Sequence, residues 1–154
     1  MMSCTMVFQP KDPDFERRVK AGVDRQSALK TLGVKILGIK PGEVELGMPH
    51  NPDLTQQHGF LHAGIVSTAL DSACGYAAFS LMPSDAAILT VEFKINLLAP
   101  ARGQYFQFQG RVVKPGRTIT VCEGDAWAFD DGKKTRIATM HGTLMALFDR
   151  PGLD

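Results

Sequence analysis

The stretch Gly59–Met82, GFLHAGIVSTALDSACGYAAFSLM, decides the fold of this chain. Asp71 is its single charged residue, and apart from His62 the rest is apolar, aromatic or small. A stretch of this length could cross a bilayer, but a carboxylate at the bilayer centre costs roughly 2.5–3.5 kcal/mol, and the stretch contains little leucine. The sequence therefore predicts a long helix buried in protein, over about residues 62–81, which ends before Pro83.

The composition is that of a soluble single domain. The chain has 154 residues, 44% hydrophobic and 21% charged, which is enough to form a core without staples. Its net charge of +1 excludes nucleic acid as an expected partner. The N-terminus lacks the pattern of a signal peptide. Three widely spaced cysteines, Cys4, Cys74 and Cys122, have no metal-finger spacing and are expected as reduced thiols in a cytoplasmic protein.

The residues before the long helix predict a helix and a pair of strands. Residues 1–12 form an extension, and Asp12-Pro13 begins a helix over residues 13–32, where apolar residues recur at helical spacing. Proline and glycine at the centre of residues 40–43 predict a type II turn. This turn joins two short strands, over residues 34–39 and 43–48.

The second half predicts four strands, over residues 90–98, 104–114, 118–129 and 135–148. In the first of them Val91, Phe93, Ile95 and Leu97 alternate with polar residues. A second type II turn at 114–117 and an Asp-Gly turn at 130–133 imply antiparallel neighbours. Such a sheet must bury one face, and the long helix can cover it. We therefore predict an α+β protein with a curved antiparallel sheet wrapped around a central helix, plus the N-terminal helix.

A helical wheel divides the long helix into two faces. One face is apolar and is expected to pack on the sheet, with Ile65, Val66, Ala69, Leu70, Ala73, Tyr76 and Ala77. The opposite face is small and nearly uncharged, with Gly64, Ser67, Thr68, Asp71, Cys74, Gly75 and Ala78. A solvated helix face normally carries several charges, so we expect a second copy of the protein to cover this one.

Asp71 is then the only carboxylate in a partly dry junction, where its pKa is open to perturbation. The structural alternative is an aspartate hydrogen-bonded to Ser67 or Thr68. The helix start at 62–64 carries backbone N–H groups without intrahelical partners, which can stabilise an oxyanion. Asp71 follows Ala63 by eight residues, about 12 Å along the axis, so the two groups can act on one carbonyl only from different subunits.

The stretch Gln56-Gln57-His58-Gly59-Phe60-Leu61-His62-Ala63-Gly64, followed by Asp71, resembles the signature of hotdog-fold acyl-CoA thioesterases of the phenylacetate-pathway (PaaI-like) family. The strand from Thr90 to Pro100 and the turn at 114–117 are similar to that family too. The likeness runs from about Leu32 to Phe148. It implies one hotdog domain with its core over 33–148, which hydrolyses acyl-CoA to a free acid and coenzyme A as a homodimer or a dimer of dimers. It implies no metal or redox cofactor.

The resemblance also implies roles for the matching residues. Asp71 is the nucleophile or the general base, donated across the dimer interface. The Ala63 N–H, with Gly64 beside it, binds the thioester oxygen. Gln56 stands where the family usually has asparagine and positions water or the thioester, and the Thr90 hydroxyl assists the water. The substrate-binding residues are His62 and, for the coenzyme A phosphates, Lys114, Gly116 and Arg117.

Two other functions stay open on the sequence alone. A non-catalytic acyl-CoA-binding protein would keep the phosphate contacts and leave Asp71 a structural residue. A hydratase or dehydratase acting on acyl thioesters calls for a histidine paired with an acid, whereas His62 and Asp71 point to opposite helix faces.

Other chemistry for the same residues is less well supported. A metal site of His58, His62 and Asp71 needs a helix at His58, in a loop-like segment, and Asp71 lies far along the axis. Cys74 as a nucleophile lacks anion-stabilising surroundings. Arg111, like Arg117, can be a solvated charge at a strand end.

Overall fold

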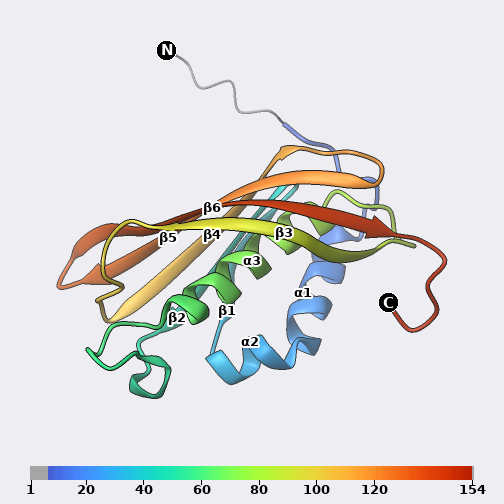
Figure 1. Cartoon of the computed structure of the whole chain (residues 1–154). Coiled ribbons are helices and arrows are strands. Elements are labelled where there is room, and N and C mark those ends of the chain that lie inside the picture. Colours follow the sequence, from blue (N-terminus) through green and yellow to red (C-terminus); the bar gives the residue numbers. More distant parts are fainter. Residues whose placement is uncertain (1–6, 154) are drawn as a thin grey trace, which may run out of the picture.

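The sheet has six antiparallel strands in the order β1-β2-β4-β5-β6-β3, and it curves around helix α3 (Ala63–Phe79), as Figure 1 shows. The structure is a computed structural model that describes residues 7–153; Cys4 and the first half of the predicted extension lie outside the described residues. The predicted α+β fold class is confirmed. The strands are β1 (Lys35–Lys40), β2 (Glu43–Pro49), β3 (Ala87–Leu97), β4 (Tyr105–Lys114), β5 (Ile119–Asp130) and β6 (Lys133–Leu147).

The N-terminal segment forms two helices where one was predicted, α1 (Phe15–Arg25) and α2 (Ser27–Leu32). Asp14, and not Asp12, occupies the N-cap position of α1. Asp12 instead accepts a hydrogen bond from the Asp14 N–H at 2.9 Å. Gln26 separates the two helices because its backbone is extended, with φ −76° and ψ 99°. The break turns the Gln26 side chain towards α3, where the Tyr76 hydroxyl donates to it at 3.1 Å.

Two of the three predicted turns are confirmed and one is not. Gly42 has φ +78°, as the third position of a type II turn requires, and Asp131 and Gly132 take the left-handed conformations of a tight hairpin. Gly116, in contrast, has no positive φ, and the connection between β4 and β5 is an open loop. Glycine is needed there because a Cβ would collide with the carbonyl oxygen of Ile119.

Helix α3 is buried in protein, as predicted. Of its seven predicted sheet-facing residues, Val66, Ala69, Leu70, Ala73 and Ala77 are at most 1% exposed, whereas Ile65 and Tyr76 are only half-buried. Tyr76 packs on Gly22 of α1 instead. Cys74 and Ala78, which the wheel placed on the opposite face, are buried as well, because a curved sheet encloses more of the helix than a flat one. Within residues 7–153 no helix is long and apolar enough to span a membrane.

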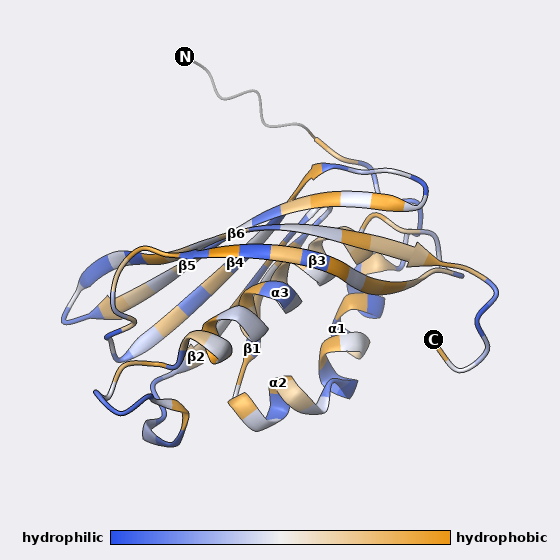
Figure 2. Cartoon of the chain, in the orientation of Figure 1, coloured by the Kyte–Doolittle hydropathy of each residue, from blue (hydrophilic) through white to orange (hydrophobic). Residues whose placement is uncertain are grey.

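Strand β3 is an edge strand with exposed apolar side chains. It pairs only with β6, and Val91 and Leu97 are 54% and 57% exposed. Polar and apolar residues alternate along it in Figure 2. A register shift between Thr90 and Glu92 breaks the strict alternation that was predicted, so Thr90 lies on the same sheet face as Ile95. Long, exposed apolar edges are normally covered by another chain or element.

Helix α3 approaches the sheet closely at Gly110 of β4. A Cβ there would lie inside van der Waals distance of the backbone of Ala73 and Cys74. On the neighbouring strand, a Cβ at Gly124 would lie 2.9 Å from the Cys74 sulfur. Because these two glycines lack side chains, α3 packs closely on the sheet. This packing sets the distance of Asp71 from the sheet.

We expect Gly110→Ala to destabilise the fold by about 2–3 kcal/mol, because the helix backbone must move to admit the methyl group. Urea denaturation measures this as a lower midpoint. Gly38→Ala is the matched control, since no heavy atom lies within 4 Å of the added Cβ; its effect should stay within about 1 kcal/mol. Equal effects of the two substitutions would contradict the proposed contact.

Candidate active site

Asp71 lies midway along α3 and is partly buried beside β3. The Thr90 hydroxyl donates a hydrogen bond of 2.9 Å to its Oδ1. Burial raises the pKa of Asp71, and the hydrogen bond from Thr90 partly opposes that rise. The structure therefore brings together the predicted acid and the predicted strand hydroxyl, from elements far apart in the sequence.

The hydrogen bonds expected from Ser67 or Thr68 to a structural Asp71 are not seen. Ser67 donates its hydroxyl to the carbonyl oxygen of Ala63 at 2.8 Å, and Thr68 donates to that of Gly64 at 2.9 Å. Both hydroxyls therefore bond back to their own helix. The one side-chain donor on Asp71 within residues 7–153 comes from the sheet.

A cavity of about 210 Å³ opens beside Asp71. Sequence reasoning missed one of its polar walls, Gln26, because that residue reaches the site only through the break between α1 and α2. The full lining is Gln26, Asp71, Ser72, Gly75, Tyr76, Ile88, Leu89 and Thr90.

The start of α3 presents one free backbone donor. His62 occupies the N-cap, and its Nδ1 accepts the Gly64 N–H at 2.9 Å. The expected pair of donors is thus reduced to one, because the Gly64 N–H is already engaged. The Ala63 N–H has no acceptor among the described residues. His62, predicted to bind substrate, serves in this structure as the cap of the helix.

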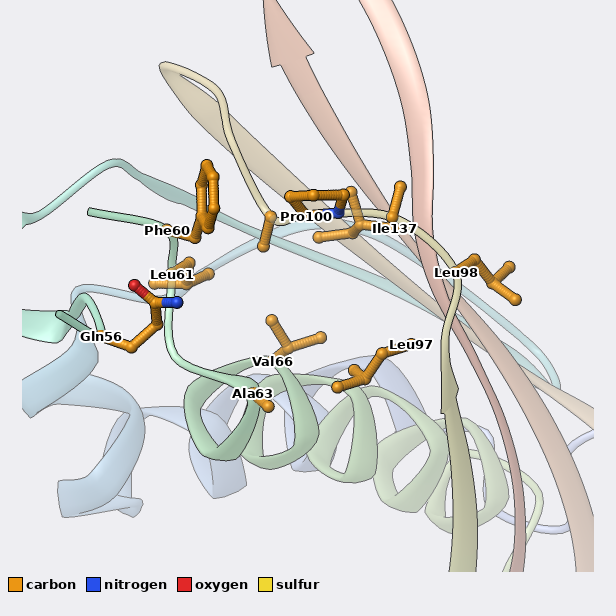
Figure 3. A pocket seen from close by; sticks show the side chains of 11 residues that line it. Gln56, Phe60, Leu61, Ala63, Val66, Leu97, Leu98, Pro100 and Ile137 are labelled. Carbon is orange, nitrogen blue, oxygen red and sulfur yellow. The ribbon is translucent and has the colours of Figure 1, made fainter. Parts of the chain in front are cut away.

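Gln56 and Ala63 line a second cavity of about 400 Å³, at the start of α3 (Figure 3). The Gln56 Oε1 accepts the backbone N–H of His58, and its amide NH₂ has no acceptor among the described residues. The remaining walls are almost entirely apolar: Phe60, Leu61, Val66, Leu97, Leu98, Ala99, Pro100, Ala101 and Ile137.

The two predicted halves of the site lie apart within one chain. Asp71 and Thr90 line one cavity, Gln56 and Ala63 line another, and the two cavities share no residue. The rise of the helix separates Ala63 from Asp71 by about 12 Å. A single carbonyl group therefore cannot contact both halves of the same chain.

Lys114, Gly116 and Arg117 lie at the opposite end of the sheet from Ala63. Their loop is held near the β1–β2 turn, since the Val112 N–H donates to the Gly42 carbonyl at 2.8 Å. The Gly42 N–H in turn donates to Ser80, just beyond the end of α3, at 2.8 Å. Lys114 and Arg117 are exposed, and neither pairs with a carboxylate within residues 7–153.

Arg111 differs from its prediction as a solvated charge. Its guanidinium bonds Glu123 at 2.8 Å and Asp125 at 2.9 Å on the outer face of the sheet. It belongs to a structural ion-pair cluster, whereas Lys114 and Arg117 have no carboxylate partner among the described residues.

Neither Cys74 nor a metal site gains support. Burial raises the pKa of the Cys74 thiol far above its usual range, so the nucleophilic thiolate does not form near neutral pH. Among the described residues, no three His, Cys, Asp or Glu side chains are arranged to hold a metal ion.

Comparison with known proteins identifies the class. The sequence profile of the thioesterase superfamily matches residues 58–135. A Halobacterium salinarum protein, provisionally described as an esterase, is 33% identical over 71% of this chain and 76% of its own length. A similarly described Saccharolobus solfataricus protein is 31% identical over 73% of this chain and 72% of its own. The chain belongs to the thioesterase superfamily.

Solved structures of two other proteins are similar to this chain. A thioesterase family protein from Silicibacter pomeroyi is 60% identical, with a TM-score of 0.86 over 87% of this chain and 98% of its own. The PaaI protein of the phenylacetic acid degradation operon of E. coli is 18% identical, with a TM-score of 0.78 over 87% of this chain and 94% of its own. The fold is the hotdog fold, which confirms the resemblance at the level of fold and superfamily.

We expect Asp71→Asn to stabilise the folded protein at neutral pH. Because the pKa of Asp71 is raised in the folded state, the wild type loses stability as the pH climbs from about 3.9, the usual value for an aspartate, through the raised pKa. The neutral amide does not have this loss. Urea unfolding between pH 4 and pH 8 measures it, with the exposed Asp85→Asn as control. A parallel pH dependence for wild type and Asp71→Asn would refute the prediction.

Proposed function

We propose that this protein hydrolyses acyl-CoA thioesters at a site shared between two copies of the chain. Asp71 and Thr90 of one copy face Ala63 and Gln56 of the other. The observation that carries the proposal is the separation within one chain of a half-buried carboxylate from a free helix-start N–H. Each group lies at its own cavity, and neither cavity contains the other half of the chemistry.

Strand β3 supports the proposal that a second copy of the chain completes the site. Its outer edge pairs with no other strand of the described residues, it carries exposed apolar side chains, and it includes Thr90, the partner of Asp71. Most soluble homo-oligomers have twofold symmetry, in which the same patch serves both copies. Pairing of two such edges about a twofold axis makes the two α3 helices antiparallel. Each helix start then faces the middle of the other helix, where Asp71 lies.

The chemistry follows from these groups. The Ala63 N–H, at the positive end of a helix dipole, donates to the thioester carbonyl oxygen and stabilises the oxyanion that develops there. Asp71 either attacks the carbonyl carbon, to form an anhydride that water then hydrolyses, or takes the proton from an attacking water. Thr90 holds the carboxylate in place. Both routes consume one water and release one acid and one thiol.

The raised pKa of Asp71 fits this task. A carboxylate that is less well solvated than usual is a stronger base and nucleophile once it is ionised. His62 does not fit the paired histidine of a hydratase, because its Nδ1 is committed to the Gly64 N–H. A purely binding role for the protein predicts no thiol release from any acyl-CoA, which a direct assay decides.

Lys114 and Arg117 are proposed to hold the coenzyme A phosphates. The chain as a whole is nearly neutral, with a net charge of +1, so an anionic substrate must be bound by a few nearby basic side chains. Both side chains are exposed and unpaired in the described structure, and charge-assisted contacts of this kind are strong.

The decisive experiment combines two inactive variants. Asp71→Asn removes the base, and we expect kcat for acyl-CoA hydrolysis to fall by about 10³-fold or more. Ala63→Pro removes the N–H at the first helical position, where proline fits, and His62 before it is already extended at ψ 138°. Its kcat should fall by about 10²–10³-fold. Ala63→Ser keeps the N–H and should keep most of the activity.

Co-expression with two different affinity tags yields a heterodimer of one Asp71→Asn copy and one Ala63→Pro copy. If each site takes Asp71 and Ala63 from different copies, one site carries both lesions and the other is intact. The heterodimer should therefore recover about half of the wild-type activity. A heterodimer as inactive as its parent variants would mean that both groups act within one chain.

We expect the double variant Lys114→Ala/Arg117→Ala to raise KM for acyl-CoA by about tenfold or more, from the loss of charged contacts. The same acyl group on a short thiol without the nucleotide should show little change. Lys133→Ala, an exposed lysine in the β5–β6 hairpin, is the control. An equal rise in KM for both substrates would remove these two residues from the phosphate site.

A further inference from the structure

A second, larger cavity lies next to the one beside Asp71. It has a volume of about 400 Å³ and lies between α1, α3 and the start of β3. Tyr76, Ile88 and Leu89 line both cavities. The two cavities are therefore adjacent, and a path from the Asp71 carboxylate into the space that helix α1 covers would run past Tyr76.

The path begins with a polar neck. The Tyr76 hydroxyl donates to the Gln26 Oε1 at 3.1 Å, and the Gln26 amide reaches Ser72 at 3.4 Å. Tyr76 is fixed in place because its ring packs on Gly22, where a Cβ would lie 2.8 Å from the ring. The neck is thus a rigid constriction made by α3 and the residue that breaks the N-terminal helices.

Beyond the neck the walls become apolar. Phe79 packs edge-on against Tyr76 with ring centroids 6.4 Å apart, and Ala86 and Ile88 line the opposite side. Arg18 also borders this space, and its guanidinium carbon lies over the Phe79 ring, 4.4 Å from the ring centroid. Its charge is therefore engaged in a cation–π contact.

The cavity is poorly suited to the phosphates of coenzyme A. Arg17 pairs with Asp14 at 2.6 Å, and Arg18 pairs with Asp12 at 3.0 Å. Arg18 also donates to the carbonyl oxygens of Met82 and Ala86. Two of its three arginines are therefore already paired with a carboxylate. The third, Arg25, is exposed and has no carboxylate partner within residues 7–153, like Lys114 and Arg117. A group that enters here from Asp71 is favoured if it is uncharged and apolar.

We propose that the cavity under α1 receives the distal part of the acyl group, so that the substrates are thioesters of elongated, apolar carboxylic acids rather than short ones. This inference rests on the function proposed above. Asp71 and Phe79 are eight residues apart, so the path is about 12 Å long. Gln26 and Tyr76 are specificity-determining residues at its neck.

The test fills the cavity from its exposed side. Ala21 lines the cavity but is exposed on α1, so Ala21→Trp adds bulk there without disturbing the core. Ala28→Trp, at an exposed position on α2 that lines neither this cavity nor the one beside Asp71, is the matched control. Both variants and the wild type are assayed with acetyl-, hexanoyl-, octanoyl- and decanoyl-CoA.

For the wild type we expect kcat/KM to rise about fourfold for each methylene that the cavity buries. Ala21→Trp should lower kcat/KM for decanoyl-CoA by about tenfold or more, and change that for acetyl-CoA by less than about twofold. Phe79→Ala, which enlarges the cavity, should move the preference towards longer chains. Ala28→Trp should match the wild type at every length.

A loss in Ala21→Trp that is the same for every chain length would overturn the inference, because the cavity would then hold a part common to all substrates, such as the pantetheine arm. Calorimetric binding to the Asp71→Asn variant separates this outcome from failure of the proposed hydrolysis. If the cavity holds the acyl group, decanoyl-CoA binds more tightly than acetyl-CoA whether or not the wild type turns either over, and Ala21→Trp removes the difference. Equal affinities in the Asp71→Asn background would refute the inference.

Discussion

The rigidity of one helix is the constraint on which the rest of this structure depends. Helix α3 carries both the free N–H of Ala63 and the carboxylate of Asp71, and its rise holds them about 12 Å apart. Gly110 lies against the backbone of the helix and the neighbouring Gly124 lies against its Cys74 and Leu70 side chains, and these close contacts hold the helix in the curved sheet. Local rearrangement therefore cannot bring the two groups together. An antiparallel copy of the same helix can, since its start then lies beside the middle of the first.

The sequence predicted the fold well where a single residue pattern decides the structure. The uncharged stretch around Asp71, the succession of strands after it and the glycine of the 40–43 turn each have one good structural solution. The prediction of a type II turn at 114–117 was wrong, because glycine is required at Gly116 for a different reason than at Gly42. Its missing side chain makes room for the Ile119 carbonyl, and a sequence does not distinguish this need from a positive φ.

The candidate site was predicted in its main residues but not in its hydrogen bonding. Asp71 and Thr90 were each identified, and the structure joins them. Helix-start geometry indicated two backbone donors, but the imidazole of His62 reaches back to one of them, and only the rotamer of that side chain reveals it. Gln26 could not be found at all, since it depends on a break in a segment whose periodicity favours one continuous helix.

The protonation equilibrium of Asp71 also limits which side chains can lie beside it. Burial disfavours the carboxylate, and the Thr90 hydroxyl offsets part of that penalty with one hydrogen bond. An arginine or lysine beside Asp71 would hold it ionised more firmly, but would also lower its basicity and compete with the substrate carbonyl for it. The small, nearly uncharged face of α3 around Asp71 keeps cations away. In the proposed assembly the small residues of the same face also let a second helix approach, so one set of residues would serve both the basicity of the acid and the completion of its site.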